Sequence, residues 1–135
     1  MTSYLLDTNH ASPLVTLEHP LRSRVLPAIQ QGDSFALTAV NLAETLYGIA
    51  GLPRAARSKL EWNRLQPAFR VYGVEEEDAI ASTEIRLRLR QRGRQMGAID
   101  VMLAAVALRY GLTLLTTDSD FAAVPELRQE NWIKL

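Results

Sequence analysis

The chain has 135 residues, of which 47% are hydrophobic, and this length and apolar content predict a single folded domain over residues 1–135 rather than a disordered chain. It contains no cysteine, which excludes disulfides, zinc–thiolate sites and thiol nucleophiles and leads us to expect a cytoplasmic location. The 15 basic and 15 acidic residues cancel, so overall charge does not mark the chain as a nucleic-acid binder. We expect neither a signal peptide nor a membrane contact, because no apolar run approaches the roughly 18 residues of a membrane span.

Short strand-like runs alternate with longer helical patterns in the first half of the chain. In these patterns Asp7 or Thr8 caps the first helix, and Gly32 ends the second. The predicted elements, in chain order, are a strand at 4–6, a short helix over 10–17, a helix over 21–29, a strand at 34–38 and a helix over 40–47.

The same alternation continues in the second half. Pro53 suits the first turn of a helix, and acidic residues followed by arginines suit the dipole of a later, long helix. The predicted elements are a helix from 53 to 66, a strand at 69–72, helices over 75–92 and 98–109, a strand at 113–116, a turn or short helix over 118–122, and an edge strand at 132–135. Because helices separate the strands throughout, we predict an α/β fold with three layers, a mostly parallel sheet between helices on both sides.

Four carboxylates stand at the ends of short apolar runs: Asp7, Glu44, Asp100 and Asp118. Asp7 ends the first strand and Asp118 follows a late one, and the carboxyl ends of parallel strands lie at one edge of a sheet. Glu44 and Asp100 lie on helices that can reach the same edge. A lone carboxylate among apolar residues is costly to bury unless it pairs or binds a metal. Oxygen donors without histidine or cysteine suit hard cations, so the pattern predicts one acidic pocket for Mg²⁺ or Mn²⁺.

Each carboxylate also has an ordinary structural explanation. Asp7 and Asp118 suit helix N-caps or Asx turns after strands, and Glu44 suits a solvated helix surface. Asp100 can be satisfied by the free N–H groups of a first helical turn. These explanations stay open for each residue alone. It is much less probable that all four residues have only such structural roles.

A polar pair follows the first carboxylate and another precedes the last, namely Thr8, Asn9, Thr116 and Thr117. Their hydroxyl and amide groups can hold carboxylates or a phosphate through hydrogen bonds. Threonine is also common at strand ends, so this assignment is open. Asp120 is a fifth acid that either contributes to the pocket or caps the short helix that follows, and the cap is the favoured assignment.

Five of the 13 arginines fall at alternate positions from 86 to 94. Alternate positions on a helix point about 200° apart, so the five cannot share one face, and most are expected to be solvated or paired with acids. Arg92 and Arg94 lie nearest Asp100 in the sequence and are the candidates for contact with a phosphate or with RNA. His10 follows the first carboxylate closely, but we expect an ordinary surface or cap role for it.

Four segments occur together in a fixed order: Leu5-Leu6-Asp7-Thr8-Asn9, the helix segment Glu44 to Gly48, the helix Gly97…Asp100…Ala104-Ala105…Ala107, and Thr116-Thr117-Asp118-Ser119-Asp120-Phe121. Any one of them is a weak signal, but their order and spacing in a chain of this length are specific. Together they resemble the PIN domain family and, within it, the VapC-type toxins of bacterial and archaeal toxin–antitoxin pairs. The resemblance covers essentially the whole chain.

The resemblance implies a five-stranded parallel sheet and endoribonuclease activity that depends on Mg²⁺ or Mn²⁺. It implies that the catalytic and metal-binding set is an acidic quartet, formed by Asp7, Glu44, Asp100 and Asp118. Asn9 and Thr116 match polar residues that support the quartet, and Asp120 matches a position that is often but not always acidic.

The resemblance also implies partners. These are an RNA substrate, a second copy in a homodimer, and a small antitoxin that joins a hetero-oligomer and inserts a segment near the acidic pocket. Helices 40–47 and 52–65, with Trp62, carry more apolar residues than one core face needs, which makes them candidates for the dimer face. A non-catalytic binding module with the same fold is the alternative that the sequence leaves open.

Overall fold

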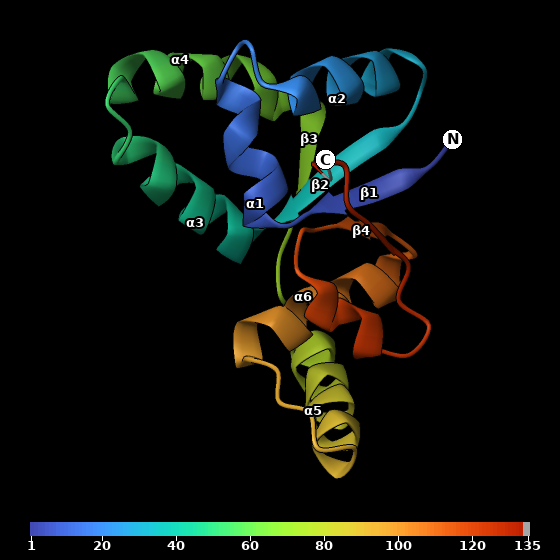
Figure 1. Ribbon diagram of the computed structural model, residues 1–135. Coiled ribbons are helices and arrows are strands. Elements are labelled where there is room, and N and C mark those ends of the chain that lie inside the picture. Colours follow the sequence, from blue (N-terminus) through green and yellow to red (C-terminus); the bar gives the residue numbers. More distant parts are fainter. Residues whose placement is uncertain (134–135) are drawn as a thin grey trace.

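Five parallel strands form one sheet at the centre of the molecule (Figure 1). The structure is a computed structural model and describes residues 1–133. The strands are β1 (Ser3–Leu6), β2 (Ser34–Thr38), β3 (Phe69–Tyr72), β4 (Thr113–Leu115) and β5 (Gln129–Glu130). Their order in the sheet is β3-β2-β1-β4-β5, so the chain first builds one side of β1 and then crosses to the other.

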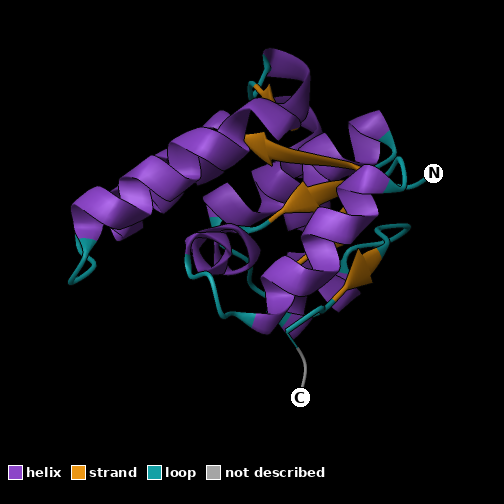
Figure 2. Cartoon of the chain, turned by 90° about the horizontal axis from the view of Figure 1, so that it is seen from above, coloured by secondary structure: helices purple, strands orange, loops and turns teal. Residues whose placement is uncertain are grey.

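Helices cover both faces of the sheet, and Figure 2 shows the strands enclosed between them from above. The helices are α1 (Thr8–Ala11), α2 (Pro20–Gln30), α3 (Ala39–Ala50), α4 (Ala55–Leu65), α5 (Glu76–Gln91) and α6 (Ala98–Tyr110), with short 3-10 helices η1 (Ser12–Val15), η2 (Gln66–Ala68) and η3 (Ser119–Ala123). Helices α1 to α4 pack on one face, and α5 and α6 pack on the other (Figure 1). Within residues 1–133, the helices all lack the length and apolar character needed to cross a membrane.

Alternation along the strands divides the core into two layers. In β1, Tyr4 and Leu6 pack under the α1–α4 layer, whereas Leu5 packs against α5 and α6. In β2, Phe35 and Ala36 divide between the same two layers. Because successive side chains of a strand point to opposite faces, a sheet buried on both sides needs nearly continuous apolar strands. This two-sided burial fixes the strand register, and the parallel pairing of the strands brings their carboxyl ends to one edge.

Local signals set the helix ends that matter for this edge. Helix α3 begins after Thr38, whose hydroxyl accepts a hydrogen bond from the Asn41 backbone N–H at 3.1 Å, as an N-cap does. Helix α6 begins after Gly97 and ends at Gly111, whose φ of 66° lies in the left-handed region that favours glycine. Asp100 therefore lies in the first turn of α6, where the helix dipole favours a negative charge.

The predicted edge strand at 132–135 is wrong at Trp132 and Ile133, and the fifth strand of the described residues lies earlier, at Gln129–Glu130. Trp132 makes no ladder pairing in the described structure, because its ring packs against the core instead. The ring lies 4.9 Å from that of Tyr4 and 5.9 Å from that of Phe35, measured between centroids. The apolar character that suggested a strand is therefore used for packing, and the last two residues of the prediction lie outside the described residues.

The predicted helix over 10–17 lies two residues earlier than expected and is divided. It begins at Thr8, changes to the 3-10 helix η1 at Ser12 and ends at Val15. Pro13 lies in the first turn of η1, and proline has no N–H to continue an α-helical ladder. The later helix α4 likewise starts at Ala55 rather than at a proline in its first turn.

Trp62 is not part of a free apolar face, contrary to expectation. Its side chain is fully buried, its ring lies 5.7 Å from that of Phe69, and its indole N–H donates to Gln66 Oε1 at 2.8 Å. Other apolar side chains of α3 and α4 do remain exposed, with Tyr47 at 85% and Leu60 at 66%. The dimer face suggested from the sequence therefore loses its tryptophan but keeps these two residues, and the dimer itself stays a prediction.

Candidate active site at the carboxyl edge of the sheet

The strand order reverses at β1, and the four predicted carboxylates meet there. Strands β2 and β4 pair with opposite sides of β1, which leaves a crevice of the kind that binds ligands in open α/β sheets. Asp7 directly follows β1, and Asp118 comes three residues after β4 ends. Helices α3 and α6 bring Glu44 and Asp100 close enough for all four charges to act on one another. The structure thus gathers residues that are spread over most of the sequence.

The Asp7 carboxylate is held by four hydrogen-bond donors. Its Oδ1 accepts from the Thr8 backbone N–H at 2.8 Å and from Asn41 Nδ2 at 3.4 Å. Its Oδ2 accepts from the Thr116 hydroxyl at 2.8 Å and from Asn9 Nδ2 at 3.2 Å. Both oxygens are therefore fixed in place before any ligand arrives, and the predicted supporting contacts of Asn9 and Thr116 are present.

Asn41 is a site residue that the sequence reasoning missed. It is buried, and its Nδ2 lies 3.1 Å from the Thr8 hydroxyl and 3.5 Å from Glu44 Oε1, which also accepts from that hydroxyl at 3.1 Å. The Thr38 hydroxyl donates to Asn41 Oδ1, which turns the amide nitrogen toward the carboxylates. The spacing could have revealed it, because residues three apart on a helix share a face and Asn41 precedes Glu44 by three.

The chain around Asp118 combines a helix cap with a place in the pocket. Asp118 Oδ1 accepts from the Asp120 backbone N–H at 2.9 Å, so Asp118 caps η3. The predicted cap role of Asp120 is therefore wrong, because the side chain two residues earlier already fills it. The Asp118 backbone N–H donates to the Thr116 hydroxyl at 3.0 Å, and that hydroxyl in turn donates to Asp7. Thr116 thereby fixes the loop that carries Asp118 relative to Asp7.

Asp100 shows most clearly that the charges converge. Burial raises the pKa of the Asp100 carboxyl, and the charges of neighbouring acids raise it further. These acids, in decreasing order of effect, are Asp7, Asp118, Glu44 and Asp120. Cap roles for Asp7 and Asp118 and an exposed position for Glu44 are all observed as well. A carboxylate that caps a helix or lies on an exposed helix surface can therefore also belong to the shared pocket.

His10 departs from its expected surface or cap role. Its side chain is completely buried, and both ring nitrogens are hydrogen-bonded. Burial, followed by the charge of Arg24, lowers the pKa of His10 from 6.5 to about 4, so the ring is neutral at physiological pH. The sequence carried no signal for this burial, because one hydrogen-bond partner of the ring, the Trp132 backbone N–H, lies at the other end of the chain.

The two arginines chosen as RNA contacts lie beside the acidic pocket. Arg94 lines a cavity of about 200 Å³ together with Asp120 and Met96. Arg92 extends toward η3 and donates to the Ala123 carbonyl at 3.5 Å. Both are exposed, as a group that meets a phosphate from solution must be.

The donor set of the pocket suits a hard divalent cation. Within residues 1–133, no three acidic or histidine side chains are gathered tightly enough to form a complete ion cage as they stand. None of the ion pairs in this part of the chain involves the four carboxylates, so their charge is not neutralised by arginine or lysine there. Uncompensated carboxylate oxygens are the ligands that Mg²⁺ and Mn²⁺ prefer. Asp7, Asp100, Asp118 and Glu44 are thus the residues that could hold an ion.

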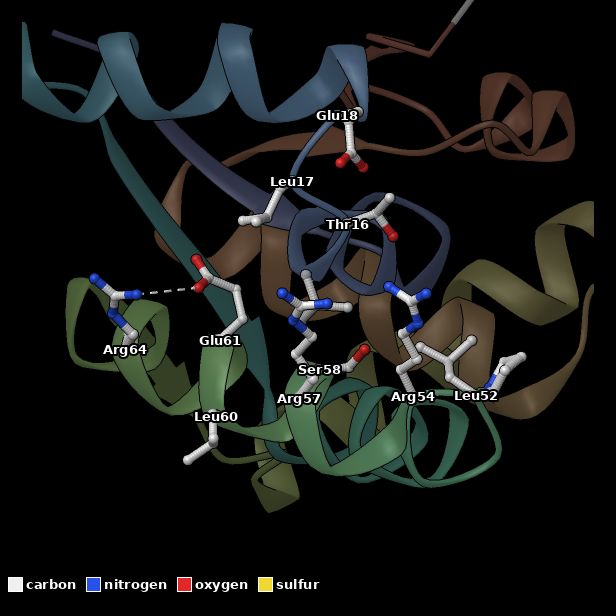
Figure 3. A pocket seen from close by; sticks show the side chains of 12 residues that line it. Thr16, Leu17, Glu18, Leu52, Arg54, Arg57, Ser58, Leu60, Glu61 and Arg64 are labelled. Carbon is white, nitrogen blue, oxygen red and sulfur yellow. Dashed lines mark ion pairs between the residues drawn. The ribbon is translucent and has the colours of Figure 1, made fainter.

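A larger cavity, of about 660 Å³, lies between η1 and α4, and none of the four carboxylates lines it (Figure 3). Arg54 and Arg57 project into it from the α4 side, opposite Thr16 (Figure 3). Leu17 and Leu60 add apolar surface that is more than half exposed. Its lining combines apolar side chains with three arginines and the two acids Glu18 and Glu61, whereas the acidic pocket is formed by carboxylates, so the two sites differ chemically.

Comparison with known proteins agrees with this architecture. The PIN domain family model matches residues 4–127. Ribonuclease VapC2 of Rickettsia felis is 24% identical over 132 residues, 97% of this chain and 98% of that protein. The tRNA(fMet)-specific endonuclease VapC of Shigella flexneri is 28% identical over 134 residues, 98% of this chain and 99% of that protein. The crystal structure of VapBC2 from Rickettsia felis bound to a promoter DNA fragment has a TM-score of 0.82 at 22% identity, covering 97% of this chain and 99% of that one. The protein with this five-stranded parallel sheet therefore belongs to the PIN domain family.

Proposed function

We propose that this protein is an endoribonuclease dependent on Mg²⁺ or Mn²⁺ and the toxin of a VapBC-type toxin–antitoxin pair. The observation that carries the proposal is the approach of four carboxylates at the switch point of the sheet, where burial and the charges of Asp7, Asp118 and Glu44 raise the pKa of Asp100. The relatives named ribonuclease VapC support the same class of reaction for this chain. The name of the Shigella flexneri relative suggests transfer RNA as one substrate to test.

In this proposal Asp7, Asp100 and Asp118 hold the ion, with Glu44 beside them. A divalent ion in this place supplies Lewis acidity, which activates water and offsets charge on the scissile phosphate. Asp7 contributes a carboxylate already oriented by four donors, which lowers the reorganisation needed during the reaction. Hydrolysis of this kind leaves a 5′-phosphate and a 3′-hydroxyl.

The antitoxin is the expected protein partner, and the fold likeness to a VapBC structure supports this choice. The cavity between η1 and α4 is lined by exposed apolar side chains, by three arginines and by two glutamates. Arg64 is paired with Glu61 there, so Arg54 and Arg57 are the basic side chains that suit a partner segment with apolar and acidic residues. A homodimer through the exposed residues of α3 and α4 and a cytoplasmic location complete the proposal.

The proposal is tested by incubating the purified, antitoxin-free chain with total bacterial RNA. Discrete cleavage products are expected with Mg²⁺ or Mn²⁺ and none with EDTA, because the carboxylates act only with a bound ion. The variant Asp7→Asn should give no products, whereas Glu84→Gln, which changes an exposed carboxylate on α5, should cleave like the wild type. Sequencing of the product ends identifies the RNA and checks the predicted end chemistry.

Cleavage that persists in EDTA would contradict the metal dependence. If the folded chain cleaves no RNA and binds no Mn²⁺ in calorimetry, the protein is instead a non-catalytic binding module with the PIN fold.

RNA contact by Arg92 and Arg94 gives a separate expected result. The double variant Arg92→Gln/Arg94→Gln should raise KM for RNA by roughly tenfold and flatten its salt dependence, with kcat little changed, because phosphate contacts bind without taking part in the chemistry. The matched control is Arg86→Gln/Arg90→Gln, which removes two exposed arginines that lie within α5, before Arg92 in the chain. Equal effects of the two double variants on KM would show that only net charge matters.

A further inference from the structure

The buried His10 ring has one defined protonation pattern. Its Nε2 lies 3.0 Å from the backbone N–H of Trp132, which can only donate, so Nε2 must accept and carries no proton. The proton of the neutral ring is therefore on Nδ1. Nδ1 lies 2.7 Å from Asn9 Oδ1 and donates to it. A backbone group from the far end of the chain thus sets the tautomer of a side chain next to the acidic pocket.

The Asn9 amide is fixed by this donation. Its Oδ1 receives two donors, His10 Nδ1–H and the Thr117 backbone N–H at 3.2 Å. Two donors on one end of the amide exclude the flipped orientation, in which the NH₂ group would meet both. The NH₂ group must therefore face Asp7, where Nδ2 lies 3.2 Å from Oδ2.

We propose that His10 is a positioning residue for RNA cleavage, acting through Asn9 on the Asp7 carboxylate and held in its tautomer by the backbone of Trp132. The inference rests on the proposed ribonuclease function. His10 touches none of the four carboxylates directly, so its effect passes through the Asn9 amide. Hydrogen-bond partners of this outer kind typically change metal affinity or activity by about 10- to 100-fold when removed.

Histidine suits this position because it offers one donor and one acceptor from a rigid ring without a charge. Phenylalanine has a ring of related shape but no donor. Without the Nδ1–H, Asn9 keeps only the Thr117 donor on its Oδ1, and its amide becomes free to rotate away from Asp7. Asp7 Oδ2 would then depend on Thr116 alone.

Three substitutions separate the two hydrogen bonds of the ring. His10→Asn places an amide N–H near the former Nδ1 and can still donate to Asn9. His10→Gln places its amide near the former Nε2, where it can accept from Trp132 but cannot reach Asn9. His10→Phe removes both hydrogen bonds. A role in positioning thus predicts rescue by asparagine alone, whereas a role in folding predicts that activity follows the melting temperature.

The first readout is steady-state cleavage of RNA by the full chain at saturating Mg²⁺. His10→Gln and His10→Phe should lower kcat by about 10- to 100-fold with KM for RNA nearly unchanged, and His10→Asn should recover most of this loss. The second readout uses the metal-free chain and needs no activity. Hydrogen exchange of the Asn9 side-chain NH₂, followed by NMR, should quicken by roughly tenfold in the glutamine and phenylalanine variants but not in the asparagine variant.

The two readouts distinguish failure of this inference from failure of the proposed function. If the wild type cleaves and His10→Gln or His10→Phe cleaves equally well, the inference is overturned while the function stands. If the wild type cleaves no RNA, the proposed function fails, and the Asn9 exchange rates still decide whether His10 holds the Asp7 support. If the Asn9 exchange rate is unchanged in His10→Phe, His10 does not fix the Asn9 amide. Faster exchange in the glutamine and phenylalanine variants, but not in the asparagine variant, supports the inference.

Discussion

Replacement of Asp100 by asparagine is expected to remove RNA cleavage and, at the same time, to raise the melting temperature of the metal-free protein. Burial and the charges of the neighbouring acids raise the pKa of Asp100 above its ordinary 3.8. The stability that this carboxyl contributes is therefore present below 3.8 and is lost as the pH rises through the raised pKa. When it is ionised, the group destabilises the fold, and asparagine keeps its shape without its charge.

Cleavage by Asp100→Asn should fall by roughly 100- to 1000-fold, because several kcal/mol of charge stabilisation are lost with the ion. Thermal denaturation in EDTA at neutral pH should show a melting temperature roughly 2–5 °C higher for the variant. Substitutions that remove charge repulsion from a functional site commonly raise stability while they lower activity. Millimolar Mg²⁺ should raise the melting temperature of the wild type and leave that of the variant nearly unchanged. Full activity in Asp100→Asn, or a lower melting temperature, would show that this carboxylate is not part of a repelling cation site.

Acidification is expected to cost the protein about 3 kcal/mol of unfolding free energy through His10 alone. The unfolded chain binds a proton at this residue below pH 6.5, whereas burial and the charge of Arg24 delay protonation of the folded chain to about pH 4. The stability from His10 is thus complete above pH 6.5 and is lost as the pH falls toward 4. Native stabilities are commonly about 5–15 kcal/mol, so this loss is a large fraction of the total.

Urea denaturation of the wild type and His10→Phe across this pH range isolates the effect from that of the carboxylates, which both proteins share. The difference in unfolding free energy between the two should change by about 3 kcal/mol between pH 6.5 and about 4, in the direction of relatively greater acid stability for the variant. The control is His19→Asn, because His19 caps α2 through its side chain and asparagine is a good N-cap. It shows how far the curves change when the other histidine is replaced and a capping side chain is kept. Parallel curves for the wild type and His10→Phe would mean that His10 takes up its proton equally in both states.

The carboxylate set could be predicted because its signal is local. Each of Asp7, Glu44, Asp100 and Asp118 lies in or next to an apolar run. The spacing of the apolar residues predicts whether the run is a strand or a helix, and the order of these elements predicts which edge of the sheet the carboxylate can reach. The alternation of strands and helices likewise predicted the parallel sheet with helices on both sides, which is confirmed. The predictions failed where local character was ambiguous. Trp132 is strand-like in the sequence, but its ring is used to cover the core.

The sequence by itself determined the α/β architecture and the choice of the four acids as candidates, since both follow from residue type and short-range period. Only the tertiary structure decided what holds those acids. Asn41 reaches Asp7 across 34 residues, and Thr116 reaches it across 109. His10 depends on a backbone N–H that lies 122 residues away. Hydrogen bonds between residues so far apart in the chain leave no pattern in the sequence. They form only when the sheet brings the ends of separate strands together.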